Sequence, residues 1–402
     1  VYIGGNMNNT PNANRKHIAI YGKTNSGKSS LLNAIVGQDI SLVSPIKGTT
    51  TDPVSKAMEL IPFGPVLFID TAGLDDNGEL GELRIKRSLK TLQKTDFAIY
   101  VVDINDICEE NYKETVNNFK KYKIPHMVVV NKIDEADENL INSVKEKFKD
   151  AVFVSAKEEK NIIELKEELI KRLQNEEEDE TLIGDIVPYN GKVIMVVPID
   201  SEAPKGRLIL PQVQLIRDCL DHGIKSYVVR DTELESALQD IKDVDLVITD
   251  SQAFKKVSQI VPEDIKLTSF SILFAKQKGD LKAFMEGISK IKELDENSKI
   301  LITESCTHNA SHEDIGRVKI PKLLNKHVGK ELNYEFKMGH DFPEDIEKYD
   351  LVIHCGACMV NKKTVQTRID MCEEKNVKIV NYGMILAYLT GILPRSLKVF
   401  DI

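Results

Sequence analysis

The chain has 402 residues, of which 42% are hydrophobic, and its 63 acidic residues outnumber its 54 basic residues to give a net charge of −9. This length predicts more than one domain, each with a core of its own. The acidic balance excludes a general binder of phosphate backbones, which needs a basic face. Six cysteines in so long a chain do not form a disulfide framework. They fit a reducing compartment and leave thiols for metal ligation.

The longest apolar stretch, residues 384–393, is interrupted by Tyr388, Thr390 and Gly391 and is too short to span a bilayer. No charged segment followed by an apolar one marks a signal peptide at the start of the chain. We therefore expect a cytoplasmic protein, with no membrane and no nucleic acid among its partners.

Residues 1–14 are rich in Asn and Gly, and we expect them to be disordered. From residue 17 to about 173, the apolar runs HIAIY, VLFID, FAIYVVD and HMVVV alternate with helical patterns. This alternation predicts a mostly parallel sheet with helices on both faces. Residues 1–174 therefore form a first domain, and the like-charged run NEEEDE at 175–180 predicts a linker.

Two further segments resemble each other. The first contains, in order, KVIMVVPID, KSYVVRD, DVDLVITDSQ and IKLTSFSILFA; the second contains SKILITESC, NYEFKMGHD, KYDLVIHCGAC and VKIVNYGMILA. Their almost equal spacing indicates an internal duplication of a four-stranded α/β unit, in residues 181–270 and 271–402. Convergence of ordinary buried strands is the alternative. The predicted fold is α/β with three domains, the last two small, similar and built on parallel sheets.

A phosphate-binding motif follows the first predicted strand. Residues 22–29 read GKTNSGKS, which matches G-x-x-x-x-G-K-[ST] between a strand and a helix. Gly22 and Gly27 allow the backbone N–H groups to point at phosphate oxygens. Lys28 supplies charge to the β- and γ-phosphates, and the Ser29 hydroxyl is a ligand for Mg²⁺. Asn25, Ser26 and Ser30 complete the predicted loop.

Three later motifs select the base and complete the site. DTAG at 70–73 provides Asp70, which holds Mg²⁺ through water, and the Gly73 amide, which contacts the γ-phosphate. NKID at 131–134 provides Asp134, whose carboxylate accepts two hydrogen bonds from guanine where adenine offers no donors. SAK at 155–157 closes over the base. The first domain is therefore predicted to be a P-loop GTPase. Its remaining binding residues are Asn131, Lys132, Ser155, Ala156 and Lys157.

These motifs resemble the TrmE–Era branch of small GTPases. GTTTD at 48–52 looks like the first switch of that branch, with Thr50 the Mg²⁺ ligand. Lys28, Thr50 and Gly73 are the predicted catalytic residues. Leu74 stands where Ras-like enzymes place a water-orienting Gln, so hydrolysis is expected to be slow. The resemblance implies that K⁺ compensates, bound by Asn25; a turn-forming role for Asn25 is the alternative.

Thiols and imidazoles follow two apolar runs in the last predicted domain. Cys306 and His308 follow the first run, and His354, Cys355 and Cys358 follow the second. Three thiolates suit a four-iron cluster with one exchangeable iron, and a Cys₃His zinc site is the rival, because spacing does not separate the two metals. Gly356 allows the backbone to approach an inorganic core. Cys108, Cys219 and Cys372 are interpreted as loop or core residues.

A GTPase followed by a segment without ligands, and then by C-T-H and H-C-G-A-C, resembles the HydF family of FeFe-hydrogenase maturation GTPases. The resemblance implies that Cys306, Cys355 and Cys358 hold a 4Fe–4S cluster; the part played by His308 and His354 varies. It also implies a homodimer formed through the middle domain. The protein would assemble a di-iron subcluster precursor, made with two radical-SAM maturases, and deliver it to apo FeFe-hydrogenase.

Two other functions compete with this interpretation. A ribosome- or RNA-associated GTPase of the TrmE–Era type could carry the same cysteines as a structural zinc site. It would need a basic RNA-binding module, and the sequence shows none. A redox enzyme would favour four cysteines and a second cofactor motif, which are also missing.

Overall fold

The computed structural model describes residues 10–37, 54–71, 88–176, 181–199, 208–305, 314–339 and 341–400. The chain divides into two compact units, Val1–Glu178 and Asp179–Ile402. Among the described residues, no helix combines the length and the apolar character needed to cross a membrane.

The first unit contains a six-stranded sheet in the order β2-β3-β1-β4-β5-β6. Its strands are β1 (Lys16–Tyr21), β2 (Val54–Leu60), β3 (Gly64–Asp70), β4 (Phe97–Asp103), β5 (His126–Asn131) and β6 (Val152–Phe153). Its helices are α1 (Lys28–Gly37), α3 (Glu109–Lys121), α4 (Glu138–Lys147) and α5 (Ile162–Asn175). All neighbouring strands are parallel except β2 and β3. The prediction of a mostly parallel sheet is therefore confirmed, with one antiparallel edge strand added.

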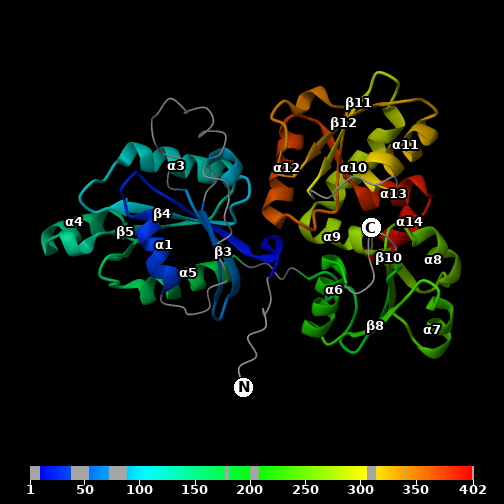
Figure 1. Ribbon diagram of the computed structural model, residues 1–402, viewed down its shortest axis with the longest axis horizontal. Coiled ribbons are helices and arrows are strands. Elements are labelled where there is room, and N and C mark those ends of the chain that lie inside the picture. Colours follow the sequence, from blue (N-terminus) through cyan, green and yellow to red (C-terminus); the bar gives the residue numbers. More distant parts are fainter. Residues whose placement is uncertain are drawn as a thin grey trace. The chain divides into compact units, whose positions relative to one another are not determined.

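The continuous apolar runs of this sheet have a simple cause. In β1, Ile18 and Ile20 belong to the core that contains α1 and α5, whereas Ala19 and Tyr21 belong to the core that contains α3 and α4. Helices thus cover both faces (Figure 1), and every residue of the central strand β1 after Lys16 is buried.

The expectation of disorder over residues 1–14 is wrong for its last residues. Asn12–Asn14 form a 3₁₀ turn in which Ala13 is buried. The Asn12 carbonyl lies 2.9 Å from Nε2 of His17, and Arg15 Nε donates to the Thr10 carbonyl at 3.0 Å. These contacts order a segment whose composition alone predicts no structure. Residues 1–9 lie outside the described residues.

The second unit contains two four-stranded parallel sheets, ordered β10-β9-β7-β8 and β12-β11-β13-β14. The first has β7 (Lys192–Val196), β8 (Lys225–Val229), β9 (Leu246–Thr249) and β10 (Lys266–Ser269). The second has β11 (Lys299–Glu304), β12 (Asn333–Met338), β13 (Leu351–His354) and β14 (Lys378–Asn381). In both sheets, the strand that comes second along the chain is an edge strand beside the first. The third and fourth strands lie on the other side of the first strand. The predicted pair of similar parallel-sheet domains is confirmed, and the three-domain α/β fold with it.

Helices follow the strands throughout the second unit. They are α6 (Leu210–Asp221), α7 (Leu234–Asp240), α8 (Phe254–Ile260), α9 (Phe270–Lys278), α10 (Leu281–Lys290), α11 (Ile320–Val328), α12 (Lys362–Glu374), α13 (Tyr382–Leu389) and α14 (Leu393–Leu397). In each copy, the first part of the fourth apolar run forms a strand and the rest forms the helix that directly follows it. Ser269 ends β10 and caps α9, just as Asn381 ends β14 and caps α13.

Helix α9 joins the two sheets. Its residues Phe270, Leu273 and Phe274 pack in the core of the first sheet, whereas Ile272 and Ala275 pack in the core of the second. A helix that is apolar on all sides is buried between layers, which explains the unbroken run SILFA. The chain returns to the first sheet at its end, where Arg395 donates to the carbonyls of Ser258, Val261 and Pro262.

Candidate functional site

The phosphate-binding loop lies between β1 and α1, as its sequence predicts. Gly22 has a φ of 144°, and a Cβ there would lie 2.2 Å from the Val101 carbonyl oxygen. Gly27 has a φ of 90°, and its Cβ would lie 2.2 Å from Nδ2 of Asn131. Both glycines are required because any side chain would be strained in conformation and would collide with a neighbouring strand end.

The predicted phosphate and Mg²⁺ ligands that the structure describes lie together. Lys28 is buried, and its ammonium group donates to the Gly22 carbonyl and, at 3.1 Å, to the Lys23 carbonyl. The Ser29 hydroxyl donates to Oδ2 of Asp70 at 2.5 Å. A hydroxyl beside a carboxylate at the end of β3 is the oxygen-rich donor set that Mg²⁺ prefers. Thr50 and Gly73 lie outside the described residues, as do the rest of GTTTD and Leu74.

Asn131 connects three of the predicted motifs. Its Nδ2 donates to the Ser26 carbonyl at 3.0 Å, and its Oδ1 accepts from the Ala156 backbone N–H at 3.0 Å. The phosphate-binding loop, NKID and SAK are thereby fixed relative to one another. Ser155 is fully buried and its hydroxyl accepts from the Glu158 N–H at 3.1 Å.

The guanine end of the site has an unsatisfied acceptor. Oδ1 of Asp134 is buried and has no hydrogen-bond partner among the described residues. A buried carboxylate oxygen left without a donor costs free energy, so this atom is suited to accept from a ligand. Lys132 adopts a left-handed backbone with φ 66°, and its ammonium pairs with Oδ2 of Asp103 at 2.5 Å.

The remaining members of the predicted nucleotide set are on the surface. Ser30 and Lys157 are exposed. Asn25 is also exposed and has a φ of 66°. Asn is among the few residues that adopt this left-handed conformation readily, so the turn alone accounts for an asparagine here. Its predicted contact with K⁺ stays a prediction.

The second predicted site lies at the carboxyl edge of the last sheet. Strands β11 and β13 are direct parallel neighbours, with Thr303 opposite His354. After β11 the chain forms β12 on one side of it and then crosses back to form β13 on the other side. Ligands of open α/β sheets bind at the carboxyl ends of strands where the chain changes direction in this way. Ser305 and Cys355 follow these strands, and the Ser305 N–H donates to the Cys355 sulfur at 3.1 Å.

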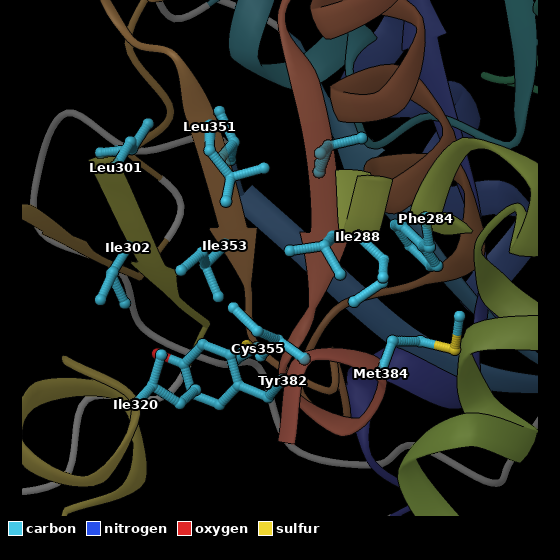
Figure 2. Packing of buried hydrophobic residues seen from close by; sticks show 14 of the residues in the cluster. Phe284, Ile288, Leu301, Ile302, Ile320, Leu351, Ile353, Cys355, Tyr382 and Met384 are labelled. Carbon is cyan, nitrogen blue, oxygen red and sulfur yellow. The ribbon is translucent and has the colours of Figure 1, made fainter. Parts of the chain in front are cut away.

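Cys355 is buried between the core and this edge. Figure 2 shows it beyond Leu351 and Ile353 of β13, near the Tyr382 ring. Burial raises the pKa of the Cys355 thiol, while its hydrogen bonds with the Ser305 hydroxyl and backbone N–H act in the opposite direction. The N–H···S bond stabilises a thiolate ligand. Cys358 is half-buried, and apart from Gly356 and its two chain neighbours no described residue has an atom within 4 Å of the position that a Cβ would take on Gly356.

The His354 ring is engaged on both nitrogens. Nδ1 lies 2.7 Å from the Cys355 carbonyl oxygen, and Nε2 lies 2.7 Å from Nη1 of Arg368. Nδ1 therefore carries the proton and donates, and Nε2 accepts. Burial, followed by the charge of Arg368, lowers the pKa of His354 to about 3. In this arrangement the imidazole supports the cysteine loop and offers no free nitrogen to a metal.

Sequence reasoning missed Arg368 and Ser305. Arg368 is 3% exposed and lies on α12 in register with Val365, Ile369 and Cys372, which form the buried stripe of that helix. An arginine within an apolar stripe at helical spacing is the signal that could have identified it. Ser305 carries no such signal: its backbone N–H donates to the Cys355 sulfur at 3.1 Å and its hydroxyl lies 3.3 Å from the same atom, contacts that no spacing in the sequence indicates.

The described residues do not assemble the whole predicted ligand set. Among them, no three His, Cys, Asp or Glu side chains are grouped so as to hold a metal ion. Cys306 and His308 lie outside the described residues. The donors that are described fit a soft metal, since Cys355 and Cys358 are two thiols, neither of them in a disulfide, in the loop that also contains Gly356.

The other described cysteines have the surroundings of packing residues. Cys219 and Cys372 are fully buried, and burial raises the pKa of each thiol to about 12. Cys108 is half-buried and directly precedes α3 in the first unit. These thiols lie on other elements than the loop that carries Cys355 and Cys358.

The fold and the nucleotide site together define a P-loop GTPase domain. Residues 17–132 match the model of the 50S ribosome-binding GTPase family. Residues 182–279 match the hydrogen maturase F dimerization domain, and residues 282–399 match the hydrogen maturase F tetramerization domain. The latter two models together cover more than half of the chain. The chain therefore belongs to the hydrogen maturase F (HydF) family.

Individual relatives resemble the GTPase part. The tRNA modification GTPase MnmE of Cytophaga hutchinsonii is 32% identical over 215 residues, which cover 50% of this chain and 45% of that protein. GTPase Der of Wolinella succinogenes is 36% identical over 169 residues, covering 39% and 36%. The chain thus spans less than half of the length of either relative. The solved structure of Aquifex aeolicus Era has a TM-score of 0.33 at 20% identity, covering 53% of this chain and 93% of Era.

Proposed function

We propose that this protein is a GTP-hydrolysing scaffold for hydrogenase maturation that holds a 4Fe–4S cluster through Cys306, Cys355 and Cys358. It assembles the di-iron subcluster precursor, its cargo, and delivers it to apo FeFe-hydrogenase. The observation that carries the proposal is the position of Cys355: its sulfur accepts a hydrogen bond from Ser305, and Cys306 is the next residue along the chain. Membership of the HydF family supports the same assignment.

The chemistry of the donors suits a carrier. Three thiolates leave one iron of a four-iron cluster with an exchangeable position. Ser305 supplies an N–H bond to one ligand sulfur, and Arg368 and His354 hold the loop that presents it. The buried guanidinium also offsets the negative charge of nearby thiolates.

The nucleotide site supplies a switch. Lys28 contacts the β- and γ-phosphates, Ser29 and Thr50 ligate Mg²⁺, and Gly73 contacts the γ-phosphate. Such contacts order switch segments with GTP and release them after hydrolysis, which biases a docking surface. Partners in this scheme are apo FeFe-hydrogenase and two radical-SAM maturases. The matched dimerization and tetramerization models support an oligomer. We propose that it includes a homodimer formed through the middle domain.

Anaerobic reconstitution followed by iron, sulfide and zinc analysis tests the proposal. The unmodified protein should bind about four irons per chain. Cys355→Ser should lose the iron and keep GTP turnover, because the two sites are built on separate units. Cys108→Ser is the matched control and should keep both. A colourless protein with one zinc per chain, or loss of iron and turnover together in Cys355→Ser, would contradict the proposal.

The same turnover assay tests the potassium site. We expect faster hydrolysis in KCl than in NaCl, since Asn25 is placed on the exposed face of the phosphate-binding loop. Equal rates would remove Asn25 from the mechanism and leave it as a turn residue.

A further inference from the structure

A lysine of α9, the helix that packs against both sheets of the second unit, binds the C-x-x-C turn of residues 355–358. Lys278 is the last residue of α9, and its side chain reaches across to the loop after β13. Its ammonium donates to the Ala357 carbonyl at 3.2 Å and to the Val360 carbonyl at 3.1 Å. These two carbonyls flank Cys358. Lys278 is 6% exposed, so the contact is made away from water.

The chemistry of this contact makes it a strong constraint. A buried ammonium is costly unless its N–H groups are used, and bonds from a charged donor are stronger than neutral ones. Ala357 has a φ of 56°, in the left-handed region that a residue with a side chain adopts only at a cost. The bond from Lys278 to the Ala357 carbonyl stabilises this conformation. The shape of the turn therefore depends on Lys278.

The end of α9 is itself fixed against the cysteine loop. Gln366 of α12 donates through Nε2 to the carbonyls of Lys278 at 3.0 Å and Gly279 at 2.9 Å. Helix α12 begins directly after the C-x-x-C turn, with Asn361 as its cap. The C-terminus of α9 thus contacts both the turn and the helix that follows it. Since α9 also packs in the core of the first sheet, the turn is tied to the packing of that sheet.

We propose that Lys278 is a positioning residue that holds the C-x-x-C turn in the conformation in which Cys355 is buried, so that access to this sulfur depends on how the first sheet of the unit packs against the second. The inference rests on the proposed function in assigning a cluster to Cys355. The contacts themselves do not depend on iron. A partner or second copy that shifts α9 would thereby change the exposure of the ligand sulfur.

Alkylation of the full-length apo protein by iodoacetamide, followed residue by residue by mass spectrometry, tests the proposal. Cys355 is 9% exposed and should react slowly in the unmodified protein. In Lys278→Met, which keeps an unbranched side chain one atom shorter and removes the charge and donors, Cys355 should react about tenfold faster or more. Cys219 and Cys372 are fully buried and report on global unfolding. Their rates should stay unchanged.

Lys276→Met is the matched control. Lys276 lies on the same helix, but its ammonium pairs with the Asp185 carboxylate at 2.5 Å and does not reach the turn. Its removal should leave the Cys355 rate unchanged. Lys278→Arg keeps a cation and its donors and should restore at least part of the protection.

Two results would overturn the proposal. One is an unchanged Cys355 rate in Lys278→Met. The other is an equal rise at Cys219, Cys372 and Cys355, which would show that Lys278 stabilises the whole unit. Iron analysis of the unmodified protein separates this inference from the proposed function. Faster Cys355 labelling in Lys278→Met together with no iron binding would support the positioning role and contradict the cluster.

Discussion

At the scale of single residues, Asp134 and Cys355 illustrate two ways in which a site is prepared. Asp134 carries a buried oxygen with no donor among the described residues, so a ligand completes its hydrogen bonding. Cys355 already accepts a bond from Ser305 and is held through its carbonyl by His354. The first site leaves an acceptor for a base with N–H donors, whereas the second is a loop whose cysteine already has hydrogen-bond partners within the protein.

Replacing Asp134 with Asn should weaken GDP binding by about 10- to 100-fold, because each hydrogen bond to a charged acceptor contributes about 1.5–3 kcal/mol. Isothermal titration calorimetry with GDP and ADP measures the effect. Asp137→Asn is a suitable control, since Asp137 caps α4 outside the site. Loss of GDP and ADP affinity by the same factor would argue against base recognition by Asp134.

At the scale of elements, the passage from strand to helix is the feature that the two copies share. β10 runs directly into α9 and β14 into α13, with a polar capping residue at each junction. Asn381 makes two contacts there: its Oδ1 accepts from the Met384 N–H at 2.8 Å, and its Nδ2 donates to the Ser271 carbonyl at 3.1 Å. The cap of one copy thus also binds the helix of the other.

Asn381→Ala should lower the unfolding free energy of the second unit by about 1–3 kcal/mol, because it removes a helix cap and the hydrogen bond to the Ser271 carbonyl. Asn381→Ser keeps a capping oxygen and should cost less. Urea unfolding followed by far-UV circular dichroism gives both values. Equal stability of the Ala variant and the unmodified protein would show that this junction contributes nothing to the unit.

At the scale of the whole molecule, the chain consists of two compact units with different chemistry. The nucleotide site lies within the first unit, and Cys355 and Cys358 lie within the second. Binding of a ligand stabilises the unit that contains its site, by about 2.7 kcal/mol at a free concentration of 100 times Kd.

Mg²⁺ and GDP should therefore raise the midpoint temperature of one unfolding transition by about 5–10 °C and leave the other unchanged, as measured by differential scanning calorimetry. The transition that moves should be absent from a chain that begins at Asp179. A shift of both transitions by the same amount would mean that the two units unfold together and that nucleotide binding is coupled to the cysteine unit.

The fold class followed from the sequence because each buried strand is a continuous apolar run between helical patterns. The edge strand β2 was missed since polar residues interrupt it and only Ala57, Met58 and Leu60 are buried, so it is not a continuous apolar run. The order of Asn12–Asn14 was missed for a different reason: it depends on contacts with Arg15 and His17, which composition does not report.

The sequence by itself determined where the two sets of candidate ligating residues lie in the fold, because each is a short motif placed directly after a strand. Only the tertiary structure assigned Lys278, Arg368 and Ser305 to the cysteine loop, and it showed that the His354 nitrogens are already engaged. These residues come from α9, α12 and the end of β11. These residues support the loop because they are buried and because packing brings their hydrogen-bond donors close to it. Neither the burial nor these contacts can be read from the spacing of any one motif.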